Sequence, residues 1–231
     1  MIGEEPAYPP QDSLEAFAAL AAHQLGEAIA LMRGAGAVIQ QQQGTLGPGG
    51  QDALRALTAG GERAQRYVDD LLDIVRAGAE AAQDGLSDLD LAFDAALAEL
   101  DPYLHRVPVH VQREALPHAA IEFGDARRVL VHLIRSALSA GATRLGITGR
   151  CEGAEAIIEF FDNGTPAPAG ARPFEPFAAP RGKGVLVGAG VSLPVSRRLI
   201  ERVGGHIGMT VRSDGATITT FHLPAAPPAR P

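Results

Sequence analysis

A histidine near the start of the chain, His23, is the residue best placed to carry chemistry. On a helical wheel of about 100° per residue, the neighbouring apolar side chains form one stripe roughly 80° wide. The stripe consists of Leu14, Phe17, Ala21, Leu25, Ala28, Met32, Ala35 and Ile39. His23 lies opposite this stripe, and Glu27 shares its face one turn later. An imidazole on the wet side of a packed helix can accept a phosphoryl group and pass it on, although a single helical histidine is more often an ordinary surface residue.

The stretch around His23 resembles the phosphoacceptor box of two-component histidine kinases. That box reads His-(Glu/Asp)-Leu-Arg-x-Pro-Leu, and the phytochrome-type version has Glu just before the Pro. Residues 23–29 read His-Gln-Leu-Gly-Glu-Ala-Ile. Gln24 therefore replaces the acid, Gly26 replaces the Arg, and Ala28 replaces the Pro that kinks the helix.

The composition is typical of a cytoplasmic protein with two cores. The 231 residues are 46% hydrophobic and carry a net charge of -7, which argues against a nucleic-acid partner. Cys151 is the only cysteine, so no internal disulfide can form. We recognise neither a signal peptide nor an apolar run long enough to span a bilayer, and we expect no membrane partner.

Two long amphipathic helices are expected in the first part of the chain. Residues 1–12 are predicted to be a flexible lead, and a helix should follow from about Ser13 to Gln41. The Gly- and Pro-rich residues 44–50 end it, and a second helix should span about Gln51 to Ala82. Its apolar face consists of Leu54, Leu57, Ala64, Val68, Leu71, Leu72 and Val75.

These two helices are predicted to form an antiparallel hairpin over residues 13–82. One hairpin cannot cover both apolar stripes, so we expect a homodimer in which two copies form a four-helix bundle. Residues 61–72 also resemble the second helix of phytochrome-type kinases. The hairpin is therefore the expected dimerisation and histidine phosphotransfer domain.

The pattern changes to mixed elements after the polar linker of residues 83–87. Helices are expected at about 89–103, 126–140 and 192–203, and strands at 107–112, 144–148, 155–161, 206–212 and 217–223. Strands with helices on one face make an α/β sandwich, so the fold class is α+β. The second domain should span residues 88–224, and residues 225–231 should be a disordered tail.

Four motifs in this second domain follow one another in a characteristic order. They are FFDNGTP at 160–166, FEPF at 174–177, GAGVSL at 188–193 and GGHIG at 204–208. Together they resemble the ATP-binding (GHKL) domain that histidine kinases share with DNA gyrase, the MutL repair proteins and a family of heat-shock chaperones. The resemblance implies that Asp162 hydrogen-bonds the adenine amino group. It also implies that glycines line a vestigial ATP pocket: Gly164, Gly188 and Gly190.

The part of this domain that should hold a metal ion departs from the family. The family reads Asn-Leu-x-x-Asn-Ala and uses the second Asn to coordinate Mg²⁺, whereas residues 132–137 read His-Leu-Ile-Arg-Ser-Ala. Ser136 offers only a short hydroxyl, which would reach an ion through water. Pro166 and Ser192 also replace glycines of the ATP-binding motifs. We therefore expect no metal site and no cofactor, with ATP and Mg²⁺ possible only if the pocket is functional.

These departures favour a histidine phosphotransferase with a degenerate ATPase domain. Autophosphorylation requires bound Mg·ATP and a base for the imidazole proton, and Ser136 and Gln24 weaken both. A relay between response-regulator receiver domains requires less, because the receiver brings its own Mg²⁺ and aspartate. In this interpretation His23 carries the phosphoryl group, while Gln24 and Glu27 orient the imidazole or line the docking face. The absence of a sensor or receiver segment suits a stand-alone relay.

Two alternatives stay open. The chain could be an active histidine kinase core that binds ATP through the pocket residues, with Lys183 or Arg181 touching phosphates. It could also be a scaffold that sequesters a receiver or a kinase without being phosphorylated. The remaining histidines show no metal-ligand spacing and are interpreted as structural or surface residues: His105, His110, His118, His132, His206 and His222.

Overall fold

The computed structural model describes residues 25–26, 29–41, 46–79, 85–105, 107–175 and 190–226. The chain divides into two compact units, Met1–Ala79 and Glu80–Pro231, which we describe separately. The predicted lead and the proposed phosphoacceptor residues His23, Gln24 and Glu27 lie outside the described residues.

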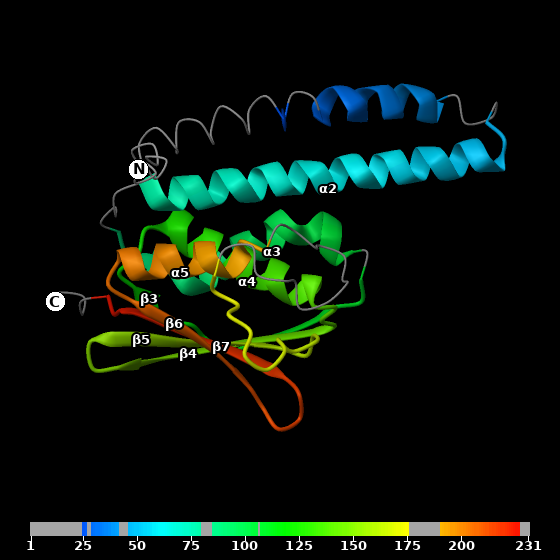
Figure 1. Ribbon diagram of the computed structural model, residues 1–231. Helices are drawn as coiled ribbons and strands as arrows, with labels where there is room; N and C mark the ends of the chain where they lie inside the picture. Colours follow the sequence, from blue (N-terminus) through cyan, green and yellow to red (C-terminus); the bar gives the residue numbers. More distant parts are fainter. Residues whose placement is uncertain are drawn as a thin grey trace, which may run out of the picture. The chain divides into compact units, whose positions relative to one another are not determined.

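The first unit contains two antiparallel helices, residues 29–41 and α2 (Pro48–Ala79) (Figure 1). Ile29 and Val68 form a small buried core between them, with Ala64 and Leu72 packed against it. Further along the first helix, Gly36 approaches Thr58, ten residues before Val68. The contacts move in opposite directions along the two helices, as a hairpin requires.

The start of α2 differs from the prediction. We expected residues 44–50 to be a break, but the helix already begins at Pro48. Proline fits the first turn because its fixed φ suits a helix and its missing N–H would have no intrahelical partner there. The Gly47 carbonyl accepts hydrogen bonds from the N–H groups of Gly50 and Gln51, at 2.9 and 3.1 Å. The described part of α2 extends to Ala79, and the predicted end at Ala82 lies outside the described residues.

The second unit is a five-stranded sheet with helices on one face (Figure 1). Its strand order is β2-β4-β5-β7-β6; β2 is parallel to β4 and the other neighbours are antiparallel. The strands are β2 (His110–Arg113), β4 (Arg144–Glu152), β5 (Glu155–Asp162), β6 (His206–Val211) and β7 (Thr217–Pro224). The helices are α3 (Leu89–Leu104), α4 (Phe123–Ser139) and α5 (Ser192–Arg202).

Alternation along the central strands explains why only one face carries helices. In β7 the buried residues are Thr217, Thr219, Phe221 and Leu223, and the residues between them are more exposed. Successive strand residues point to opposite faces, so this pattern gives a helix-covered inner face and an open outer face. The core includes Phe93 and Ile134 from the helices and Ile158, Phe160 and Phe221 from the sheet.

A second, two-stranded sheet was not predicted. It pairs β1 (Ser87–Asp88) with β3 (His118–Ala119), antiparallel. Strands this short show no alternation in the sequence. The Ser87 hydroxyl also donates a 2.6 Å hydrogen bond to the Ile121 carbonyl, a buried polar link that periodicity cannot reveal.

Several predicted boundaries of the second unit were wrong. The strand expected at 144–148 extends to Glu152, and the helix expected from Ala126 begins at Phe123. The strand expected from Val107 begins at His110, because Pro108 has no N–H to donate to the sheet. The tail was expected to be disordered from Ala225, yet Ala225 donates to the Ala154 carbonyl at 2.8 Å and Ala226 donates to the His118 carbonyl at 3.3 Å. The chain thus stays hydrogen-bonded for two residues beyond β7.

Helices α4 and α5 are joined by a nearly buried ion pair. The Arg202 guanidinium donates to the Asp125 carboxylate, and Arg128 contacts the other carboxylate oxygen at 3.5 Å. The buried Ser196 hydroxyl donates to the Ser192 carbonyl at 3.0 Å and lies 3.5 Å from the Val129 carbonyl on α4. These polar contacts hold α5 against α4.

We expect Arg202→Met to lower the free energy of unfolding of the second unit by about 2–4 kcal/mol, because the nearly buried Asp125 carboxylate loses a charged partner. Urea unfolding followed by circular dichroism measures this loss. Arg197→Met on the same helix is the control, since Arg197 pairs with Glu201 at the surface, where a pair contributes at most about 1 kcal/mol. Equal losses in the two variants would contradict a special role for the buried pair.

Candidate functional site

A buried carboxylate lies at the end of strand β5. Asp162 is 1% exposed and is the last residue of the strand, between Leu145 on β4 and Thr217 on β7. Its Oδ1 accepts a 2.9 Å hydrogen bond from the N–H of Gly164. The carboxylate is therefore held in a defined orientation by its own loop.

The next residue, Asn163, ties this loop to the start of β4. Its Oδ1 accepts from the N–H groups of Thr143 and Arg144 at 2.9 and 2.8 Å, and its Nδ2 donates to the Thr143 hydroxyl at 3.1 Å. The Thr143 carbonyl accepts in turn from the N–H of His110 at the start of β2. We call these hydrogen bonds the Asn163 clasp.

Gly164 lies directly against the C-terminal end of α4. A Cβ atom at this position would be 2.7 Å from the Ala140 Cβ and 3.1 Å from the Ala140 carbonyl oxygen, so only glycine fits. The N–H of Thr165 donates to that same carbonyl at 2.9 Å. The loop after β5 is thus docked on the end of the helix.

Three residues in the C-terminal half of helix α4 and its C-cap lie on one face of the helix. His132, Ser136 and Ala140 are spaced by four residues and so share one face. His132 is buried and Ser136 is half-buried. The hydroxyl of Ser136 is therefore the short polar group one turn before the position that Gly164 touches.

Gly190, another residue of the predicted ATP pocket, lies two residues before the start of α5. It has a φ of 78°, a left-handed conformation that favours glycine. The next residue, Val191, is the N-cap of α5, and among the described residues it makes no side-chain cap hydrogen bond. Gly188, Arg181 and Lys183 lie outside the described residues.

The donor set suits a nucleotide better than a directly bound metal ion. Asp162 supplies a buried carboxylate of fixed orientation, and such a group can accept a hydrogen bond from an amino group. On α4, Ser136 brings only a hydroxyl where a hard divalent cation prefers a carboxylate or amide oxygen. The residues present fit ATP, and they do not fit direct Mg²⁺ ligation at Ser136.

Sequence reasoning missed the contacts that position this site. The Asn163 clasp and the docking of Gly164 on Ala140 join segments about 20 residues apart. A polar Asn following a strand is a general turn signal, but it does not specify which backbone groups the side chain binds.

Residues 124–227 match the family described as histidine kinase-, DNA gyrase B-, and HSP90-like ATPase. Among curated proteins, the chain is 27% identical over 220 residues to the sensor histidine kinase GlrK of Escherichia coli K12, covering 88% of this chain and 45% of GlrK. It is also 27% identical over 191 residues to the signal transduction histidine-protein kinase AfsQ2 of Streptomyces coelicolor, covering 80% of this chain and 35% of AfsQ2.

Two solved structures show the same fold. Full-length ShkA in complex with AMPPNP has a TM-score of 0.68 at 19% identity, over 96% of this chain and 47% of ShkA. The Acinetobacter baumannii histidine kinase AdeS has a TM-score of 0.59 at 17% identity, over 89% of this chain and 98% of the AdeS chain.

The family match and the curated relatives support a histidine kinase-type ATPase core in the second unit, and the solved structures show its fold. The homologues are sensor histidine kinases, and this chain spans less than half the length of the curated relatives it matches. The phosphoacceptor hairpin, the degenerate state of the ATPase and the assignment of Asp162, Gly164, Gly188 and Gly190 to a pocket stay predictions. Among the described residues, no helix is long and apolar enough to cross a membrane.

We expect Asn163→Ala to lower the free energy of unfolding of the second unit by about 1–3 kcal/mol, because two backbone N–H groups lose their acceptor. Urea unfolding measures the change. Thr165→Ala is the control, since it keeps the backbone N–H that binds the Ala140 carbonyl. An Asn163→Ala variant as stable as the control would show that the clasp does not position the loop.

Proposed function

We propose that this chain is the ATP-dependent kinase core of a two-component sensor histidine kinase. In this proposal ATP binds the second unit, its γ-phosphoryl group moves to His23, and a response-regulator receiver domain then takes it. The buried, oriented Asp162 carboxylate beside Gly164 carries the proposal. The similarity to named sensor histidine kinases supports it over the relay that we first inferred from the sequence.

The base-recognition step follows from the geometry of Asp162. A carboxylate oxygen accepts a hydrogen bond from the adenine 6-amino group, whereas guanine presents a carbonyl oxygen at that position. Oδ1 accepts a hydrogen bond from the N–H of Gly164, which orients the carboxylate. Full-length ShkA, a structure of similar fold, was solved in complex with AMPPNP, which supports nucleotide binding in this proposal.

The phosphoryl transfer exchanges one bond for another. The bond between the γ-phosphorus and the bridging oxygen breaks, a bond to an imidazole nitrogen of His23 forms, and ADP leaves. The imidazole also loses a proton, which Gln24 cannot accept. Glu27, four residues later, is the carboxylate that we assign to this role.

A homodimer through the first unit is part of the proposal. Leu25, Met32 and Ile39 are seven residues apart and are 52%, 47% and 40% exposed in the single chain. A seven-residue spacing keeps them on one side of the helix, as in a coiled-coil seam. The small core around Ile29 does not cover this stripe, which suits a second copy.

A relay between receivers remains the second candidate. Ser136 and Gln24 favour it, because both replace residues that the family uses for autophosphorylation. A relay would use the same His23 but take its phosphoryl group from an aspartyl phosphate instead of ATP.

Incubation with γ-labelled ATP and Mg²⁺ tests the main proposal. We expect label on the wild type, none on His23→Ala, and at least tenfold less on Asp162→Asn, which weakens adenine binding. Asp214→Asn, at an exposed turn beside Arg212, should label like the wild type.

A parallel sample receives receiver domains phosphorylated with acetyl phosphate. Label only from a receiver, lost in His23→Ala, would replace the kinase by the relay. No label from either donor would contradict both the kinase and the relay, and would favour the non-phosphorylated scaffold.

Light scattering at micromolar concentration tests the homodimer. We expect a dimer for the wild type and a monomer for the double variant Met32→Glu, Ile39→Glu, because two charges enter the apolar seam. Leu31→Glu is the control, since Leu31 is 80% exposed and lies off the stripe. A monomeric wild type would contradict the proposed four-helix bundle.

A further inference from the structure

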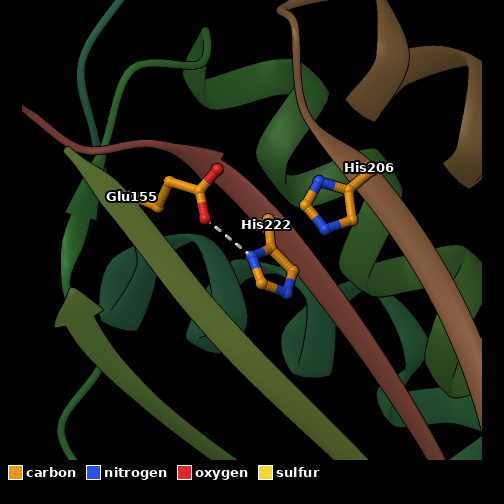
Figure 2. A group of neighbouring side chains, drawn as sticks. All are labelled: Glu155, His206 and His222. Carbon is orange, nitrogen blue, oxygen red and sulfur yellow. Dashed lines mark hydrogen bonds and ion pairs between the residues drawn. The ribbon is translucent and has the colours of Figure 1, made fainter. Parts of the chain in front are cut away.

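Two histidines and a glutamate meet on the outer face of the sheet. His206 is the first residue of β6 and lies directly opposite His222 on β7, while Glu155 is the first residue of β5, beside β7. Figure 2 shows the three side chains on three neighbouring strands, with the dashed line joining Glu155 to His222. The three residues are far apart in the sequence and are brought together only by the strand register.

The polar atoms of this cluster are close enough to share one ligand. His222 Nδ1 lies 3.0 Å from Glu155 Oε2, and the imidazole rings of His206 and His222 stack with centroids 3.9 Å apart. One ligand atom from each residue lies within 4.8 Å of the other two. Atoms that bind one tetrahedral Zn²⁺ ion at about 2.0–2.1 Å are roughly 3.3 Å apart. The pair His222 Nδ1 and Glu155 Oε2 is already near that separation.

The cluster is accessible and separate from the candidate nucleotide site. His222 alternates with the buried residues Phe221 and Leu223 of β7, so it faces away from the helices. His206 is exposed, and rotation of its side chain can turn a ring nitrogen toward the other two ligands. Asp162 lies at the opposite end of β5 from Glu155 and belongs to the buried, inner-face set.

Gly205 fixes the close approach of His206 to His222. A Cβ at residue 205 would lie 2.2 Å from the His222 carbonyl oxygen and 2.9 Å from Ile200 Cγ2. Its N–H donates to the Ile200 carbonyl at 3.0 Å, which anchors the start of β6 to the end of α5. The first histidine is thus held on a backbone that cannot easily move away from β7.

A cation on the same face, Arg150, is already paired with carboxylates. Arg150 on β4 lies opposite Ile157, the residue that in turn lies opposite His222. Hydrogen bonds to Glu152 and Glu159 hold the guanidinium and raise the pKa of Arg150. A metal cation at the cluster therefore meets little uncompensated positive charge.

We propose that His206, His222 and Glu155 form a binding site for a divalent transition-metal ion, with Zn²⁺ as the best match. Two imidazoles and one carboxylate are ligands that Zn²⁺ takes readily, and water completes a tetrahedral set. The ion replaces the hydrogen bond between His222 Nδ1 and Glu155 Oε2, and the ring proton of the neutral imidazole then lies on Nε2. Because β6 is an edge strand, the bound ion fastens that edge to β7 and β5.

The test is zinc titration of the full chain carrying no polyhistidine tag. Calorimetry with ZnCl₂ should give one site per chain, and Co²⁺ should give the visible absorption of a tetrahedral nitrogen–oxygen site. We expect each of His206→Ala, His222→Ala and Glu155→Gln to weaken zinc binding at least tenfold. His110→Ala should bind like the wild type, because His110 lies on β2 at the other edge of the sheet.

Thermal unfolding provides the second readout. Zinc at about 100 times its dissociation constant should raise the midpoint of the second unit by about 5–10 °C in the wild type and in His110→Ala only. If His222→Ala fails to fold, exposed His206→Ala carries the test alone. Wild-type affinity in His206→Ala, or no zinc binding by the wild type below millimolar concentration, would overturn the proposal. A stacked pair with only a structural role would give no zinc-dependent shift.

Discussion

The second unit depends on a side chain that takes the place of backbone hydrogen bonding. Asn163 accepts from two consecutive N–H groups at the start of β4, where the β4–β5 ladder ends. The clasp fixes the loop that contains Gly164, and Gly164 in turn fits against the last turn of α4 only because it has no side chain. Asp162 owes its orientation to the same loop, so the candidate adenine acceptor is positioned by neighbours that never touch the base.

Histidine kinase-type architecture is readable in this sequence because its signals are local. The bounds predicted for β5, β7 and α5 agree with the structure to within one residue. The strands of the β1–β3 pair are too short to alternate, and the start of α2 was hidden because Pro48 and its glycines are typical of both turns and helix starts. The prediction failed at these elements because their local composition is compatible with two structures.

The two candidate sites also differ in how far the sequence could predict them. Asp162 and Gly164 belong to one short motif, so a resemblance could indicate them. Glu155, His206 and His222 belong to three strands, and only the register of β5, β7 and β6 makes them neighbours. No spacing rule along the chain could find that cluster, which is why the histidines were first interpreted separately. The proposed function is a kinase and not the relay first inferred, because Ser136 and Gln24 are single changes within a chain that is otherwise similar to sensor kinases.

The unequal cores of the two units have a consequence for cooperativity. Ile29 and Val68 make a small core for the helical pair, whereas the sheet unit buries many large side chains, including Phe93, Phe160 and Phe221. A chain of two units can unfold in more than one transition, and a single midpoint then does not describe it. The helical pair can open locally while the sheet stays folded. In the proposed kinase, which dimerises through its helical pair, the stability of that pair would therefore respond to protein concentration.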